Sequence, residues 1–228
     1  MAIVMKIKNI MHYHMALVGG FLGGYAVMFA ASMFGNAQTV NLINAVRDMF
    51  SGDLSALLLR LLGALIYFAA LAFTVILPRL VRVNLEYVAL GVDGACLLIL
   101  AVLPKGVNDF FILYPIFFAM AFQWPVFSEI EGFNSSTIFS SNNYRQFTTA
   151  ILSYALDRKT EQLNKARVYG FTLLYFHIGV ALACVSTAFF GRTAALAAFL
   201  PLVSALCFKL KGEKQRRRAF LTDSIRPK

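Results

Sequence analysis

Two polar stretches interrupt an otherwise apolar chain: SMFGNAQTVN at residues 32–41 and NSSTIFSSNNYRQ at residues 134–146. Inside a lipid bilayer every backbone N–H and C=O group must find a partner, so irregular segments are tolerated there only against protein or a water-filled cavity. The placement of these two stretches therefore decides whether the chain is a plain helix bundle or one that builds an internal polar site.

The rest of the chain is apolar enough to be dissolved in lipid. Of its 228 residues, 59% are hydrophobic and 14% are charged, whereas soluble domains carry about 25% charged residues. A helix that crosses the ~30 Å hydrocarbon core needs about 17 to 25 residues. The apolar segments near or within that length are 14–34, 54–77, 85–103, 110–127, 168–190 and 194–208. We therefore predict an all-α membrane protein with about six transmembrane helices.

Eight crossings are the alternative, because the segments 37–50 and 143–156 are also fairly apolar. Each has about 14 residues, and at 1.5 Å per residue such a helix reaches only about 21 Å. Length therefore favours six crossings.

Much of the net charge of +10 lies directly after the last apolar segment, in KLKGEKQRRR at residues 209–218. Basic clusters of this kind stay on the cytoplasmic side and attract anionic lipid, which explains the charge without nucleic acid. We expect a multi-pass protein of the bacterial inner membrane with both termini in the cytoplasm. Residues 1–210 would form a single transmembrane domain, and residues 211–228 a basic tail.

The order of segments repeats within the chain. Residues 10–103 and residues 108–208 each read as a span, a polar stretch, a short amphipathic segment and two further spans. Three spans are an odd number, so the second half would lie upside down relative to the first. Inverted repeats of this kind occur in secondary transporters, where broken helices meet near the bilayer midplane. We predict two inverted three-helix repeats, each with a short broken or re-entrant helix.

Each polar stretch contains an Asn that we expect at a helix start, Asn36 and Asn143, because Asn is a strong N-cap residue. Two helix N-termini near the midplane, with Arg145 beside one of them, would favour an anion. The alternative is that both stretches are ordinary loops at the membrane surface. The predicted substrate-binding residues are Asn36, Gln38, Thr39, Gln123, Asn142, Asn143, Arg145 and Gln146.

Two ionisable residues lie inside predicted spans, Asp93 and His177. Ionisable side chains at membrane depth are costly, so they need a partner or a cavity. We take both as candidates for proton coupling and as a pair that could bond to each other; a hydrogen bond that only locks helices together is the alternative. Arg60 lies near the start of its span, and we expect it to reach the interface.

The motif Phe34-Gly35-Asn36 after a Gly-rich span, together with residues 135–146, resembles the YoaK-like family of small bacterial membrane proteins. The resemblance covers residues 12–210. It implies a transporter-like membrane fold of a family whose domain has no known function, and it brings no defined substrate.

We therefore predict a secondary transporter or channel-like carrier for a small polar solute, with an anion favoured, bound between two Asn-capped broken helices. The alternative is a non-transporting binding or scaffold protein with interfacial amphipathic helices and a basic tail that recruits lipid or a partner. The sequence shows no catalytic, metal-binding or cofactor-binding motif, so we expect no enzyme. The Gly19-Gly20-x-x-Gly23-Gly24 stretch permits close helix contact, either within the protomer or across a homodimer.

Overall fold

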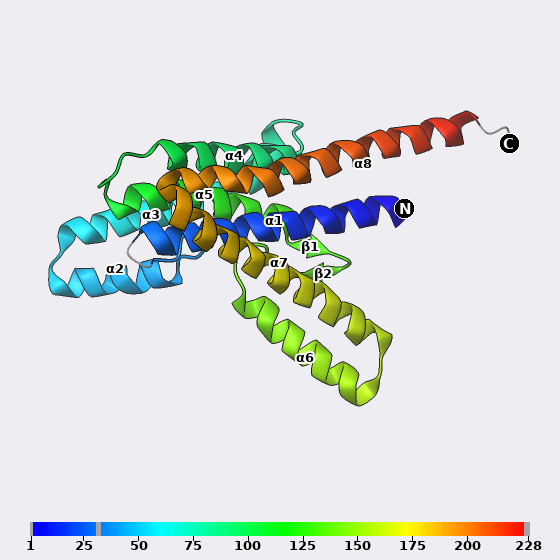
Figure 1. Cartoon of the computed structure of the whole chain (residues 1–228), viewed down its shortest axis with the longest axis horizontal. Coiled ribbons are helices and arrows are strands. Elements are labelled where there is room, and N and C mark those ends of the chain that lie inside the picture. Colours follow the sequence, from blue (N-terminus) through cyan, green and yellow to red (C-terminus); the bar gives the residue numbers. More distant parts are fainter. Residues whose placement is uncertain (1, 31–32, 226–228) are drawn as a thin grey trace.

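The computed structural model describes residues 2–30 and 33–225, with side chains from 7 to 216 apart from the same gap. Its long elements are helices, in an order that occurs twice: a long helix, an irregular segment, a short helix and two further helices (Figure 1). The first half comprises α1 (Ala2–Phe29), α2 (Thr39–Ser51), α3 (Leu54–Leu80) and α4 (Leu85–Val102). The second comprises α5 (Asp109–Phe127), β1 (Glu129–Ile130), β2 (Phe133–Asn134), α6 (Ser141–Asp157), α7 (Thr160–Phe190), the 3-10 helix η1 (Gly191–Ala198) and α8 (Phe199–Ile225).

The predicted spans are helical with two exceptions at their ends. Helix α1 ends at Phe29 and not at Phe34, so the first irregular segment is longer than expected; Ser32, its predicted start, lies outside the described residues. The last predicted span is not one regular helix, because it begins as the 3-10 helix η1 and continues as α8. Helix α8 then runs on to Ile225, through the boundary that we predicted for the tail.

Four helical segments of the described chain are long and apolar enough to cross a membrane: Leu54–Leu80, Leu85–Val102, Asp109–Phe127 and Thr160–Arg216, the last of which includes α7, η1 and most of α8. These segments indicate a membrane protein. Helix α1 is not among them, although we predicted a span there. It lies among other helices, with Met15 and Phe21 fully buried, so it does not have to be as apolar as a helix that faces lipid.

Glycines place α1 against its neighbours at very short distances. A Cβ on Gly20 would lie 1.9 Å from the carbonyl oxygen of Phe176 in α7, and a Cβ on Gly179 in α7 would lie 2.0 Å from the carbonyl oxygen of Leu17. Only glycine at both positions allows the two backbones to approach this closely. The Gly-rich stretch is therefore used for packing inside the chain.

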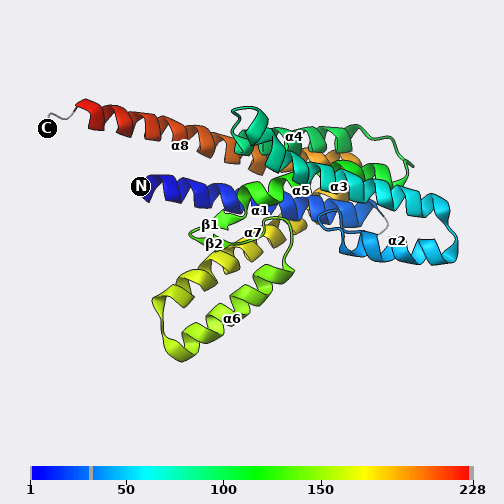
Figure 2. The same ribbon diagram turned by 180° about the vertical axis from the view of Figure 1, so that it is seen from behind.

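The helices pack in corresponding pairs. Helix α1 packs on α7 and α8, whereas α5 packs on α3 and α4. Each short helix packs on the helix that follows it, α2 on α3 and α6 on α7, and α1 and α5 also pack on each other. Both views show α6 and the first part of α7 standing away from the bundle (Figure 1, Figure 2).

The outer surface of the bundle is apolar, as expected for a surface that faces lipid. Helix α3 contributes many of its exposed large hydrophobic side chains: Leu54, Leu58, Leu61, Leu62, Leu65, Phe68, Phe73, Val75, Ile76 and Leu80.

Candidate functional site

The first irregular segment, residues 30–38, turns back along α1. Gly35 lies against Ala26, and the side-chain amide of Asn36 donates to the carbonyl oxygen of Gly19 at 2.7 Å. Gly19 precedes the end of α1 at Phe29 by ten residues, so the chain returns about 15 Å along the helix. Helix α2 then begins three residues after Asn36, at Thr39.

The second irregular segment, residues 128–140, makes a similar return. Glu131, in the turn between β1 and β2, accepts a hydrogen bond from Asn9 near the start of α1. Six residues later the carbonyl oxygen of Thr137 lies against Gly19, where an added Cβ would be 2.2 Å away. From Asn9 to Gly19 is again ten residues of α1, or about 15 Å.

The two segments meet beside the middle of α1. Asn36 donates a second hydrogen bond, also 2.7 Å, to the carbonyl oxygen of Ile138. From α5, Gln123 donates to the carbonyl oxygen of Met15 at 3.1 Å and to the hydroxyl of Thr137 at 2.9 Å. The break junction, as we name it, consists of four fully buried residues: Asn36, Gln123, Thr137 and Ile138.

Unpaired polar atoms gather in and beside the break junction. Buried polar groups in proteins nearly always have a partner. Among the described residues, the side-chain oxygens of Asn36, Asn41 and Gln123 and the side-chain nitrogen of Gln38 are buried without one. The remaining unpaired atoms of this kind are on Asp93 and Gln215. The junction thus has hydrogen-bonding capacity that the protein itself does not use.

The predicted role of Asn36 and Asn143 as helix caps is wrong. The N-cap residue of α2 is Gln38 and that of α6 is Ser140, and neither side chain makes a capping hydrogen bond. Asn caps occur instead at α4 and α5, where Asn84 and Asn108 accept from backbone N–H groups at 3.0 Å. Position in the sequence did not reveal which Asn residues precede a regular helix.

Asn143 holds the second irregular segment together. Its side-chain amide donates to the carbonyl oxygens of Ser136 (2.6 Å) and Phe139 (3.5 Å). Its side-chain oxygen accepts from the backbone N–H of Ser136 (3.1 Å) and the hydroxyl of Ser135 (3.3 Å). Because both ends of the side chain are occupied, Asn143 is a structural residue here.

A pocket of about 370 Å³ lies between the second irregular segment, α6 and α7. The break pocket, as we name it, is lined by Trp124, Asn134, Ser136, Phe139, Asn142, Gln146 and Tyr169. It includes two of the predicted binding residues, Asn142 and Gln146. It lies next to the junction in the chain, because Trp124 follows Gln123 and Ser136 precedes Thr137.

Two of the predicted binding residues lie away from the buried centre. Arg145 is exposed on α6, where its guanidinium donates to the side-chain oxygen of Asn142 at 3.1 Å. Thr39 is exposed at the start of α2. The structure therefore brings Asn36 and Gln123 together with Thr137, a residue that the sequence analysis did not select.

Asp93 and His177 do not form the predicted pair. Asp93 is fully buried in α4, and neither of its carboxyl oxygens has a hydrogen-bond partner among the described residues. His177 is exposed on α7 and bonds to the carbonyl oxygen of Leu173 in the preceding turn, at 2.7 Å. Helix α4 packs on α5, η1 and α8.

Arg60 also differs from expectation, because it does not extend to the surface. It is buried and forms an ion pair with the buried carboxylate of Asp48, which Arg47 also contacts at 2.7 Å. Asp48 was not among the predicted residues, yet the buried face of α2 has a helical spacing, with Asn41, Ala45 and Asp48 four and then three residues apart. That spacing is typical of a helix face that packs against protein, and it could have identified Asp48 as a buried residue.

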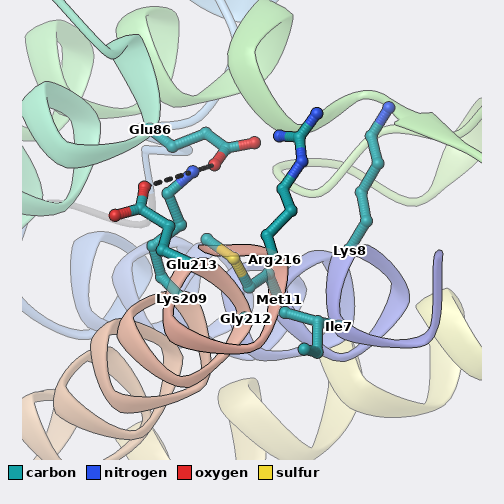
Figure 3. A pocket seen from close by; sticks show the side chains of 8 residues that line it. All are labelled: Ile7, Lys8, Met11, Glu86, Lys209, Gly212, Glu213 and Arg216. Carbon is teal, nitrogen blue, oxygen red and sulfur yellow. Dashed lines mark hydrogen bonds and ion pairs between the residues drawn. The ribbon is translucent and has the colours of Figure 1, made fainter. Parts of the chain in front are cut away.

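A second, charged pocket lies where the start of α1 meets α4 and α8 (Figure 3). Lys209 of α8 bridges Glu86 of α4 and Glu213 of its own helix. Lys8 of α1 pairs with Glu129 of β1 at 3.4 Å. These ion pairs fasten the end of the bundle that holds both termini, far along α1 from the break junction.

Comparison with known proteins identifies a family and nothing more specific. Residues 11–208 match the model of a family described as "Protein of unknown function (DUF1275)". No curated protein and no solved structure matches the chain.

Proposed function

We propose that this chain, which belongs to the DUF1275 family of unknown function, is a secondary transporter or channel-like carrier whose small polar solute binds at the break junction. One observation carries the proposal: where the two irregular segments meet inside an apolar bundle, the buried side-chain oxygens of Asn36 and Gln123 have no hydrogen-bond partner among the described residues. Such segments need a water-filled cavity or protein around them. A solute or water in the junction would supply the missing partners.

We further propose that the two halves form an inverted repeat of three crossings each, as the repeated order of segments in the sequence predicted. The packing pairs support this. In the two halves α1 corresponds to α5, α2 to α6, α3 to α7 and α4 to α8. The packed pair α1–α7 then corresponds to α5–α3, α1–α8 to α5–α4, and α2–α3 to α6–α7, and all of these pairs are in contact. In inverted-repeat transporters the substrate site lies where the repeats meet.

The orientation that we propose is the one expected from charge, with both termini in the cytoplasm of a bacterium. Both termini lie at the same end of the bundle in Figure 1, as an even number of crossings requires. Lys8 and Lys209 lie at that end, together with the basic tail. The positive-inside rule places such an end in the cytoplasm.

Asp93 is our proposed proton-coupling residue. A carboxyl group that is fully buried within a membrane helix and has no partner among the described residues can take up a proton without losing an ion pair. Replacing Asp93 by Asn should abolish uptake driven by a pH gradient but leave exchange of solute at equal pH. Loss of both, in a variant that elutes as the parent does, would contradict coupling.

The test of the proposed function uses purified protein in liposomes and a broad panel of metabolites and ions. We expect at least one compound to cross faster than in protein-free liposomes and to raise the unfolding temperature of the detergent-solubilised protein. Gln123→Met should remove the shift in unfolding temperature, whereas Asn164→Ala, on the exposed face of α7, should retain it. If no compound crosses and none shifts unfolding, the carrier is excluded and the scaffold alternative gains.

A further inference from the structure

We infer that the solute is a neutral molecule rich in hydroxyl groups, such as a polyol, and not the anion that the sequence favoured. This inference rests on the proposed function and specifies its substrate class. It is drawn from the chemistry of the break pocket and of the break junction, which agree with each other.

The break pocket offers polar groups without charge. Asn134, Asn142, Gln146 and Ser136 line it, and none of its seven lining residues, all of them described, is ionisable at neutral pH. A side-chain amide or hydroxyl both donates and accepts hydrogen bonds. A hydroxyl group of a solute does the same, so it can bond to a side-chain amide or hydroxyl of the lining either as donor or as acceptor.

Neither Arg145 nor Arg60 is among the residues that line the break pocket. Arg145 is exposed and directs its guanidinium to Asn142. Arg60, beside the first irregular segment, is paired with the buried carboxylate of Asp48. An anion that entered the pocket would leave water without meeting a cationic side chain among the lining residues, and burial of an unpaired charge is strongly unfavourable.

The unpaired atoms in the junction and on the nearby residues Gln38 and Asn41 also disfavour an anion. Three of them are acceptors, the side-chain oxygens of Asn36, Asn41 and Gln123, and one is a donor, the nitrogen of Gln38. A carboxylate or phosphate brings mainly acceptors, which cannot bond to oxygen. A hydroxyl group can donate to these oxygens and can accept from the nitrogen.

Aromatic rings complete the pocket. Trp124 and Phe139 are in edge-to-face contact, with ring centroids 4.9 Å apart, and Tyr169 donates to the carbonyl oxygen of Asn134 at 3.0 Å. These rings give an apolar wall for the C–H groups of a solute, while the amides face its hydroxyl groups. The volume of about 370 Å³ lies at the lower end of the range for ligand pockets.

Osmotic swelling of proteoliposomes tests the inference with matched solutes. Erythritol, ribitol and sorbitol are compared with the aldonates of the same chain lengths, and sorbitol also with glucamine, which carries an ammonium group. We expect at least one polyol to enter at least tenfold faster than in protein-free liposomes. Its charged counterparts should enter no faster than without protein.

Variants connect this flux to the pocket. Asn142→Asp and Gln146→Glu each add a carboxylate to the wall and should slow polyol entry at least tenfold. Asn164→Asp, which makes the same chemical change on the exposed face of α7, should leave it unaltered. Unfolding temperatures and elution volumes show whether each variant is folded, and either pocket variant suffices if the other is not.

The outcomes separate the two proposals. Entry of an aldonate or of glucamine in preference to the polyols would overturn the neutral class and leave the carrier standing. Equal polyol entry through the parent and a folded Asn142→Asp or Gln146→Glu variant would overturn the assignment of this pocket. No entry by any solute of the set would overturn the neutral class, and the carrier itself would fall only if the broad panel also failed.

Discussion

The two irregular segments occupy corresponding places in the chain but are held in different ways. The second is fastened from within: Asn143 makes four hydrogen bonds to it, and a short β-hairpin ties it to the start of α1. The first is fastened mainly by Asn36, whose side-chain oxygen has no partner in the part of the chain that the structure describes. The comparison indicates a rigid second segment and a first segment whose bonding is incomplete until a solute or water joins it.

The largest loss of stability is expected when the ion pair between Arg60 and Asp48, in the first half of the chain, is broken. Asp48→Ala leaves the guanidinium of Arg60 with no carboxylate, so this variant should lose more stability than any other variant considered below. Chemical denaturation in detergent should show this loss. The double variant Asp48→Leu/Arg60→Met should recover most of it, because no buried charge is then left unpaired. A double variant no more stable than Asp48→Ala would show that the ion pair itself is required.

The next largest loss of stability is expected when the side-chain amide of Asn143 is removed. Asn143→Leu leaves the backbone N–H and C=O of Ser136 without this partner, and each buried unpaired group costs about 1 to 3 kcal/mol. We expect a loss of stability of about 3 kcal/mol, measured in the same way. Asn142→Leu, one residue earlier and more exposed, should change stability by less than about 1 kcal/mol. Equal effects at the two positions would contradict the structural role of Asn143.

Substitutions at two glycines of α1 test how rigidly each of the two irregular segments is held. A methyl group on Gly19 would meet the backbone oxygen of Thr137 at 2.2 Å, whereas one on Gly23 would meet the side chains of Phe34 at 2.8 Å and Asn36 at 3.0 Å. Side chains can move aside, but backbone cannot without disturbing the second segment.

Gly19→Ala should therefore destabilise by about 1 to 3 kcal/mol, the usual cost of overpacking. Gly23→Ala should cost less. Gly91→Ala, where nothing lies within 4 Å, is the control and should be neutral or stabilising because alanine favours helix. A Gly23→Ala variant less stable than Gly19→Ala would reverse our view of which segment is rigid.

The smallest change in stability is expected at Gln123. Gln123→Met preserves the volume and removes an unpaired buried oxygen together with two hydrogen bonds. These contributions nearly offset each other, so we expect a change of less than about 1 kcal/mol. A large loss of stability in Gln123→Met would identify Gln123 as a structural residue, like Asn143.

The helices and the irregular segments could be predicted from the sequence because they depend on local composition. Apolar length located the long helices, and the polar stretch that contains Gly35 and Asn36 falls within the first irregular segment, although α1 ends earlier, at Phe29. The difference between Asn36 and Asn143 could not be predicted, because it depends on which backbone groups tertiary packing brings to each side chain. Asn143 meets Ser136 within its own segment, whereas Asn36 meets Gly19 and Ile138 from other parts of the chain.

The surroundings of Gln123 and Asp93 likewise depend on how the helices pack. Gln123 was selected because it precedes Trp124 and Pro125 near the end of a span, but its contact with Met15 becomes visible only when α1 and α5 are packed. Asp93 was found because a carboxyl group in an apolar run is conspicuous. Asp93 and His177 lie apart because His177 is on the side of α7 that faces outward. Helical periodicity alone did not show which side of α7 this is.

Thiol accessibility tests the central claim most directly, namely that the two irregular segments line one polar route from opposite sides of the membrane. A chain in which Cys184 and Cys207 are replaced by Ala carries either Gln38→Cys or Asn142→Cys, and is treated in oriented vesicles with a small, charged, impermeant thiol reagent. We predict that the Gln38→Cys variant reacts from outside and the Asn142→Cys variant from the cytoplasmic side, while the buried native Cys96 does not react. If both variants react from the same side, or neither reacts more than Cys96, the account is contradicted.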